Sequence, residues 1–183
     1  MASWDHGTVE GKQVFSICAL RDRTSDRPRA VLLDEHCNEG ITTPEHDVQD
    51  ALETLERNGL TYQDIDMWVG DIPATSTRYE VRKSNTGLRK ELARALGVNL
   101  KSLRPIHQPH KHAGSLSYGM RMLNTLFHRD HLHVDSRCVG FIQGAKTFKG
   151  DPRDPFKDPL DAPRYGIEKG CTGRVMRTLT ARY

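Results

Sequence analysis

Long hydrophobic runs are absent from this 183-residue sequence, and only 36% of its residues are hydrophobic. No stretch approaches the roughly 18 apolar residues that a membrane-spanning helix needs, and the first residues lack the basic-then-apolar pattern of a secretory signal. We therefore expect a soluble, intracellular protein with no membrane partner. The length is that of one ordinary domain with a core of its own.

Paired cysteines are also missing. The four cysteines are scattered along the chain, and no two of them stand at Cys-x-x-Cys spacing. We expect buried free thiols rather than disulfides or a zinc finger. Two groups of histidines leave a zinc site open as an alternative: His107, His110 and His112, and His128, His131 and His133.

Charge is distributed unevenly behind a net charge of +3. Residues 34–66 carry ten acids and one base, whereas residues 78–111 carry nine bases and two acids. Solvated helix faces would explain such runs. A basic surface beside a cluster of carboxylates would equally suit a substrate rich in phosphates.

Apolar runs and turn residues outline the first elements. Residues 13–21 and 29–37 predict a hairpin that pairs with a short strand around Asp5. Thr43 is placed to cap a helix that ends near Asn58, because apolar residues follow it at helical spacing. The chain thus opens with three antiparallel strands and a helix.

Two aspartates stand three residues apart near the end of the chain. Asp158 and Asp161 lie in the stretch Lys-Asp-Pro-Leu-Asp-Ala-Pro-Arg-Tyr of residues 157–165, and they share one face if this stretch is helical. Carboxylates held close together raise each other's pKa unless a cation lies between them, so the pair predicts a metal ion. Because a proline inside a helix costs about 3 kcal/mol, Pro163 leads us to expect a helix that begins late, near Leu160 or Asp161.

Two further aspartates are placed to complete such a site. Asp71 follows the apolar run Met-Trp-Val-Gly of residues 67–70, which predicts a buried strand with a carboxylate at its C-terminal end, where α/β sheets place ligands. Asp5 lies in the first predicted strand, just before a glycine-rich turn. Acids from an early strand, a middle strand and a late helix are the arrangement of a two-metal nuclease, and their oxygen ligands suit Mg²⁺ or Mn²⁺.

In this order the motifs resemble the nuclease domain of the large terminase subunit of tailed bacteriophages, which belongs to the RNase H-like group with the Holliday-junction resolvases. The motifs are Asp-x-Gly from Asp5, hydrophobic-Gly-Asp ending at Asp71, and Asp-x-x-Asp-Ala-x-Arg-Tyr from Asp158. The resemblance covers nearly the whole chain. Two positions depart from the family pattern: Lys157 stands where terminases often have an acid, and Pro163 where they usually have leucine.

The resemblance implies a fold and an activity. The fold would be α/β, with an RNase H-like mixed sheet of three antiparallel strands followed by parallel strands, flanked by helices, in one domain over residues 1–183. The activity would be that of a metal-dependent endonuclease that cuts concatemeric viral DNA during genome packaging, in the host cytoplasm. A Holliday-junction resolvase and a non-catalytic DNA-binding module of the same fold are the alternatives.

The resemblance also implies which residues act. Asp5, Asp71, Asp158 and Asp161 would be catalytic and would hold two Mg²⁺ or Mn²⁺ ions about 4 Å apart, one activating water and the other stabilising the departing 3′ oxygen. Which of Asp158 and Asp161 is the principal ligand depends on where their helix begins.

Double-stranded DNA is the implied substrate. Arg78, Arg82 and Lys83 lie in the loop after the predicted strand end, where substrates are commonly met, and we expect them to contact phosphates. Lys111 precedes a predicted helix whose N-terminus favours anions, so we expect it near the scissile phosphate.

Other partners would act through a longer chain. The sequence has no Gly-x-x-x-x-Gly-Lys-Ser/Thr motif and hence no Walker-type ATP site, so the resemblance implies an ATPase motor upstream, with the small terminase subunit and the portal as further partners. Residues 1–3 have the form of a cloning remnant. Residues 169–183, with four bases and no acid, are expected to form a basic tail.

Overall fold

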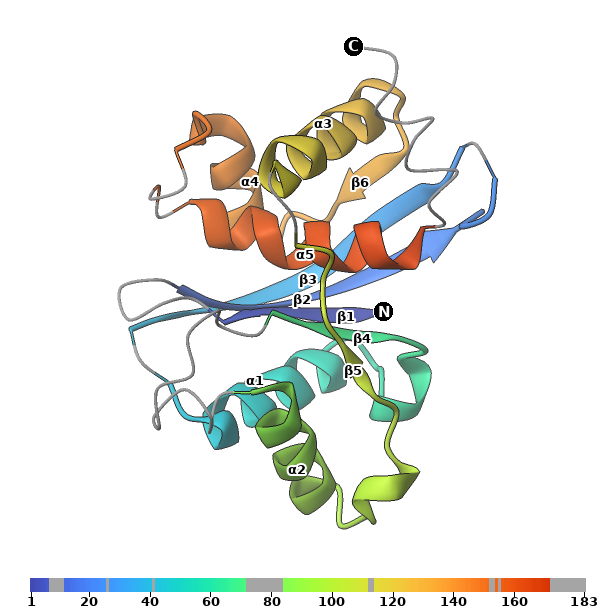
Figure 1. The fold of residues 1–183 in the computed structure, drawn as a ribbon, viewed down its shortest axis with the longest axis vertical. Helices are drawn as coiled ribbons and strands as arrows, with labels where there is room; N and C mark the ends of the chain where they lie inside the picture. The colour runs from blue at the N-terminus through green and yellow to red at the C-terminus, as the bar shows by residue number, and fades with distance from the viewer. Residues whose placement is uncertain are drawn as a thin grey trace.

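A six-stranded mixed sheet with helices on both faces forms the protein (Figure 1). The computed structural model describes residues 1–6, 12–25, 27–40, 42–71, 84–111, 114–151, 154 and 156–171. The strands are β1 (Ala2–His6), β2 (Lys12–Arg21), β3 (Arg29–Glu39), β4 (Trp68–Gly70), β5 (Ile106–His107) and β6 (Leu132–Val134). The α-helices are α1 (Pro44–Glu56), α2 (Asn85–Ala95), α3 (Ser115–His128), α4 (Val139–Thr147) and α5 (Lys157–Gly170).

The strand order is β5-β4-β1-β2-β3-β6. Strands β1, β2 and β3 are antiparallel neighbours, as the hairpin pattern predicts. Strands β4 and β5 extend the sheet parallel to β1 on one side, and β6 pairs parallel with β3 on the other. The predicted RNase H-like α/β architecture, with antiparallel strands followed by parallel ones, is therefore confirmed.

Successive side chains of the central strands point to opposite faces of the sheet, so they contribute to two hydrophobic cores. Beneath the sheet, α1 and α2 pack on an aromatic cluster in which the Trp68 ring lies 5.0 Å from Trp4 and 5.1 Å from Tyr62, centroid to centroid. Above it, α3, α4 and α5 pack on aliphatic side chains such as Leu32 and Leu126. The sheet thus separates the two helical layers (Figure 1).

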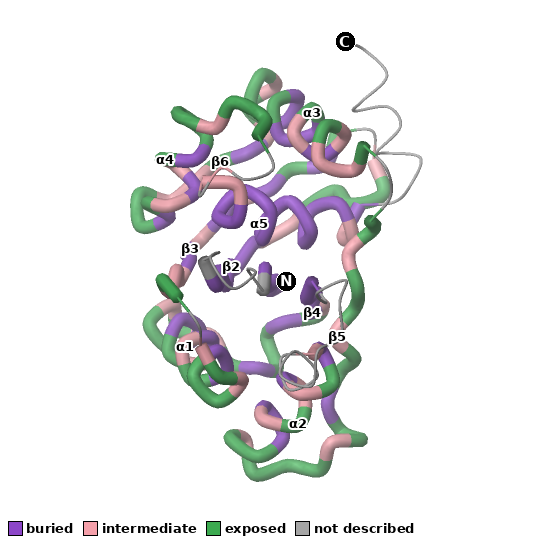
Figure 2. The backbone as a smooth tube through the Cα atoms, turned by 60° about the vertical axis from the view of Figure 1, so that its left-hand side comes forward, coloured by how far each residue is buried: buried purple, intermediate pink, exposed green. Residues whose placement is uncertain are grey.

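Helix α5 lies directly on the sheet, and its residues 158–168 are all buried (Figure 2). Two glycines permit this close approach. A Cβ at Gly166 would lie 2.4 Å from Met1 Cε, and one at Gly170 would lie 2.2 Å from Leu20 Cδ1. Residues 1–3 belong to this packing whatever their origin, since all three are buried at the start of β1.

The late start expected for this helix is wrong. Helix α5 begins at Lys157 and contains Pro163, which has no N–H to donate to the carbonyl four residues earlier. The burial of residues 158–168 offsets that lost bond. The early start matters because it places Asp158 and Asp161 on one helix.

The helix capped by Thr43 is confirmed, since its side chain accepts a hydrogen bond from the His46 N–H at the start of α1. The four cysteines are free thiols, and three of them are buried. Within the described ranges, no helix combines the length and apolar character needed to cross a bilayer.

Candidate functional site

Asp5 and Asp71 lie side by side at the ends of two parallel strands. In the register of β1 and β4, Trp4 is opposite Gly70, and the Asp71 N–H donates to the Trp4 carbonyl at 3.2 Å. Alternation turns Ser3 and Asp5 away from the aromatic core and toward α5. Parallel pairing therefore brings the first two predicted site residues to one edge of the sheet.

Gly70 in the hydrophobic-Gly-Asp motif has a packing role. A Cβ at this position would lie 2.2 Å from Asn85 Oδ1, and the Asn85 side-chain amide donates to the Gly70 carbonyl at 2.8 Å. Asn85 is the first residue of α2. The glycine thus lets α2 fasten the end of β4 immediately before Asp71.

Helix α5 completes the cluster from above. The Lys157 ammonium lies 2.8 Å from Asp158 Oδ1, 3.0 Å from Asp161 Oδ2 and 4.0 Å from Asp5 Oδ2. The Tyr165 hydroxyl lies 3.3 Å from both Asp71 Oδ2 and Asp161 Oδ2. The structure therefore brings all four predicted acids together, although they come from three distant parts of the chain.

Asp161 is fixed by a buried arginine. Arg164 Nε donates to Asp161 Oδ1 at 2.8 Å, and its guanidinium lies 4.4 Å from the centre of the Tyr165 ring. One of its terminal nitrogens also reaches the Ser115 carbonyl of α3 at 3.3 Å. Arg164 is only 2% exposed, so its side chain acts as a fixed support for the carboxylate.

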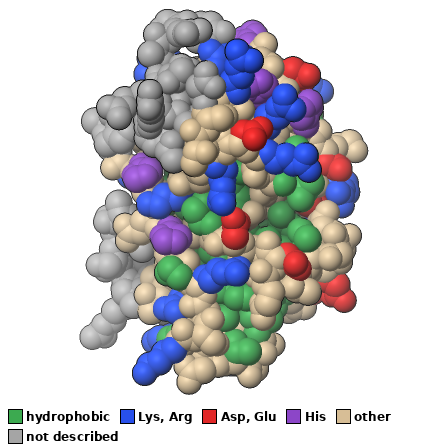
Figure 3. Space-filling model, turned by 90° about the vertical axis from the view of Figure 1, so that its right-hand side faces the viewer, with side chains coloured by type: hydrophobic (Ala, Val, Ile, Leu, Met, Phe, Trp, Pro, Cys, Tyr) green, Lys and Arg blue, Asp and Glu red, His purple; other side chains and the backbone are tan. Residues whose placement is uncertain are grey.

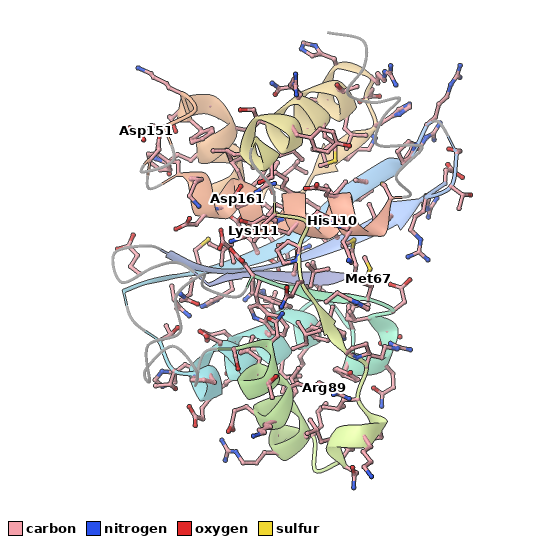
Figure 4. The ribbon with its side chains drawn as sticks, viewed as in Figure 1. Met67, Arg89, His110, Lys111, Asp151 and Asp161 are labelled. Carbon is pink, nitrogen blue, oxygen red and sulfur yellow. The ribbon has the colours of Figure 1, made fainter. Side chains whose placement is uncertain are left out.

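Lys111 approaches the cluster from the open side. Its ammonium pairs with Asp71 Oδ2 and lies 5.8 Å from the centre of the Tyr165 ring, and its side chain is 48% exposed. Figure 4 shows Lys111 and Asp161 close together where the chain passes in front of α5. The predicted DNA contacts Arg78, Arg82 and Lys83 lie outside the described residues.

Burial raises the pKa of two of the clustered acids, Asp5 and Asp71. Burial raises the pKa of Asp5 well above its usual value, Lys157 partly offsets this, and the other three carboxylates raise it further. Burial also raises the pKa of Asp71, against the ion pair with Lys111. Burial alone would lower the pKa of Lys157, but the carboxylates around it raise that pKa instead. The cluster is therefore a strong site for positive charge.

The donor set fits a hard divalent cation. Two carboxylate oxygens, Asp5 Oδ2 and Asp71 Oδ1, are buried without a hydrogen-bond partner, and such atoms are costly unless a cation satisfies them. Oxygen ligands of this kind suit Mg²⁺ and Mn²⁺. Among the described residues, no three His, Cys, Asp or Glu side chains already form a metal-binding group; at this cluster, an ammonium stands among the acids.

Sequence reasoning did not assign roles to the cationic and hydroxyl partners of these acids. The sequence marks Lys157 only as a departure from the family pattern, and Arg164 and Tyr165 only as positions of the last motif. Helical spacing could have found all three, since they stand four residues before, and three and four residues after, Asp161.

Comparison with known proteins supports the fold. No protein-family model matches the sequence, and no curated protein matches it. Among solved structures, the chain is similar to the nuclease domain of the large terminase from bacteriophage SPP1 with bound Mn, with a TM-score of 0.56, 18% identity, and coverage of 92% of this chain and 84% of that one.

A second solved structure gives the same result. The large terminase from a thermophilic bacteriophage matches with a TM-score of 0.59 and 14% identity, over 91% of this chain and 38% of that one. This chain thus has the fold of phage large terminase nuclease domains, as the resemblance in its motifs implies.

Proposed function

We propose that this chain is a divalent-metal-dependent endodeoxyribonuclease that cuts concatemeric viral DNA during genome packaging. Asp5, Asp71, Asp158 and Asp161 are its catalytic residues and hold two Mg²⁺ or Mn²⁺ ions. The observation that carries the proposal is the convergence of these four buried acids on a fold shared with phage terminase nuclease domains.

The chain's own residues prepare the site. Asp5 and Asp71 come from adjacent strand ends, and Asp158 and Asp161 come from one helix. The Tyr165 hydroxyl and the Arg164 guanidinium keep Asp161 oriented. When bound, the metal ions supply Lewis-acid activation of water and stabilisation of the leaving 3′ oxygen, so no side-chain nucleophile is needed.

Lys111 is the described residue best placed to meet DNA at the site. It is half exposed and lies beside Asp71, so its ammonium can turn to a phosphate oxygen. We propose that Arg78, Arg82 and Lys83 extend this contact along double-stranded DNA. The face shown in Figure 3, which is the right-hand side of Figure 1, carries exposed Lys and Arg side chains interspersed with Asp and Glu.

Packaging requires more than this chain. Since the chain matches only 38% of the large terminase from the thermophilic phage, we propose that it is one domain of a longer polypeptide with an upstream ATPase. Its further partners would be the small terminase subunit and the portal, and its place of action the host cytoplasm. Alone, it should cut DNA without translocating it.

The test is cleavage of supercoiled plasmid in Mn²⁺. Asp71→Asn should lower the cleavage rate by about a thousandfold or more, because it removes a charged ligand while keeping the side-chain shape. Asp130→Asn is the matched control, since that side chain is 92% exposed and its positive φ suits asparagine.

Cleavage by Asp71→Asn at the wild-type rate would contradict the assignment. A wild-type protein that binds duplex DNA but leaves it uncut in both Mg²⁺ and Mn²⁺ would favour the non-catalytic module. Strong preference for a four-way junction over linear duplex would favour a resolvase.

A further inference from the structure

Lys157 lies at the centre of the acidic cluster. Its ammonium is within 4.0 Å of carboxylate oxygens of Asp158, Asp161 and Asp5. Its side chain is 23% exposed, so it is neither sealed in the core nor free in solvent. The proposed cleavage mechanism gives this lysine no step.

An ammonium can take the place of a cation among carboxylates. It carries one full charge and three donors on a flexible four-carbon stem, and it has no acceptor. Without a cation, the buried acids at this site would repel one another strongly. Lys157 lowers this repulsion at Asp5, Asp158 and Asp161 in the absence of metal.

The second lysine repeats the arrangement at the other strand end. Lys111 pairs with Asp71, whereas Lys157 serves Asp5 and the two acids of α5. The two differ in freedom, because Lys111 reaches the site from a connecting segment and Lys157 is the first residue of α5. Lys157 is therefore tied to the helix that carries two of the predicted ligands.

We propose that Lys157 is a built-in counter-ion, which occupies the cation position among Asp5, Asp158 and Asp161 in the metal-free protein and leaves it when a divalent ion binds. This inference rests on the proposed function, since it assumes that these acids bind metal. Lys157 is a positioning residue: it keeps the ligands gathered and competes with the ion for them. Its partial exposure gives the ammonium a route to solvent, where a DNA phosphate could receive it.

Competition predicts opposite effects on stability and on metal binding. Lys157→Gln should lower the melting temperature of the protein in EDTA, because the acids lose their counter-ion. The same change should tighten Mn²⁺ binding about tenfold, because the ion no longer displaces an ammonium. A residue with a merely structural role would weaken metal binding when removed.

The experiment is calorimetric titration of Mn²⁺ into wild type, Lys157→Gln and Lys157→Arg, with Lys169→Gln as the control on the same helix. Lys157→Arg keeps the charge and should bind Mn²⁺ with wild-type affinity, as should the control. If Lys157→Gln binds Mn²⁺ as weakly as wild type or more weakly, the inference is overturned and the proposed nuclease stands. If wild type takes up no Mn²⁺, both are overturned.

A measurement on the wild-type protein tests the inference even if the Lys157→Gln variant does not fold. Acetylation of Lys157 by an amine-reactive reagent, followed by mass spectrometry, should be slow in EDTA and several-fold faster in Mn²⁺, because displacement frees the amine. Lys169 should react equally under both conditions. Unchanged or reduced reactivity of Lys157 in Mn²⁺ overturns the inference.

Discussion

At the scale of single residues, Asp161 is held from three sides. Lys157 and Arg164 bind its two oxygens at 3.0 and 2.8 Å, and the Tyr165 hydroxyl lies 3.3 Å away. Arg164 can lie there only because Gly119 of α3 has no side chain, since a Cβ at Gly119 would come within 2.1 Å of Arg164 Cδ. Gly119, which lies outside the motifs, therefore affects the orientation of the predicted metal ligand Asp161 through Arg164.

Gly119→Ala tests this packing. Alanine favours helix over glycine by about 1 kcal/mol, so a free surface position would gain stability. Here the buried Arg164 cannot move away, and we expect a net loss of about 1–3 kcal/mol in urea unfolding, together with weaker Mn²⁺ binding. Ser117→Ala, at an exposed position of the same helix, is the control and should be nearly neutral. A more stable Gly119→Ala protein would refute the role of this glycine.

The positions of the four aspartates in the fold could be inferred from the sequence, but most of the residues that hold them in place could not. Each aspartate follows a strand pattern or repeats at helical spacing, so its place in the fold can be inferred locally. The contact of Gly119 with Arg164 joins two helices far apart in the chain, and no local pattern records it. The position of Lys157, four residues before Asp161, does indicate a contact between them. A lysine among predicted metal ligands, however, is first taken as a departure from the family pattern.

At the scale of elements, β3 is fastened to both helical layers through Asp34. This buried carboxylate accepts from Arg57 Nε at 2.6 Å and from the Asn58 amide at 2.7 Å, both just after α1. Arg137, just before α4, lies 3.6 Å away. Burial works against ionisation, yet the bonds from Arg57 and Asn58 hold the pKa of Asp34 below its usual value.

Asp34→Asn should therefore destabilise the protein in a pH-dependent way. At pH 7 we expect a loss of about 2 kcal/mol in urea unfolding, because charge-assisted bonds become neutral ones. Because the pKa of Asp34 is lower in the folded than in the unfolded protein, the ionised carboxylate stabilises the fold at pH values above its unfolded-state pKa. The difference in the free energy of unfolding between wild type and variant should therefore be constant above about pH 4 and shrink below it. Asp130→Asn should show no such gap, and a gap that widens in acid would rule out this account.

Helix α5 shows where local reasoning about elements stops. Pro163 led to the prediction of a late start, which is wrong, because tertiary packing lets the helix begin at Lys157. Gly166 and Gly170 let α5 press onto β1 and β2, and burial of the whole helix outweighs one lost backbone bond. By contrast, the β2–β3 hairpin and the capped α1 are set by neighbours in sequence, and both were predicted correctly.

At the scale of the whole molecule, the two charge runs of the sequence meet on one face. The acidic run includes α1 and the basic run includes α2, and these helices pack side by side under the sheet (Figure 1). Exposed bases of the second run extend from α2 to the site: Lys90, Arg94, Lys101, Arg104 and Lys111. Lys111, at the cluster, is the point where this positive charge reaches the predicted metal ligands.

The fold class was predictable because the three motifs occur in the chain order of the family that the sequence resembles. The orientation of the basic segment was not, because charge runs do not reveal which helices pack together. What the sequence and the fold share is one arrangement: acids from β1, from the end of β4 and from α5, gathered at one edge of the sheet.

The most direct test of that arrangement is an anomalous difference map from crystals of the wild-type protein soaked in Mn²⁺. The account predicts two peaks at direct coordination distance from oxygens of Asp5 and Asp71, with Asp158 or Asp161 as a further ligand and the Lys157 ammonium moved away. Manganese bound elsewhere on the protein, with Lys157 still among the three acids, would contradict it.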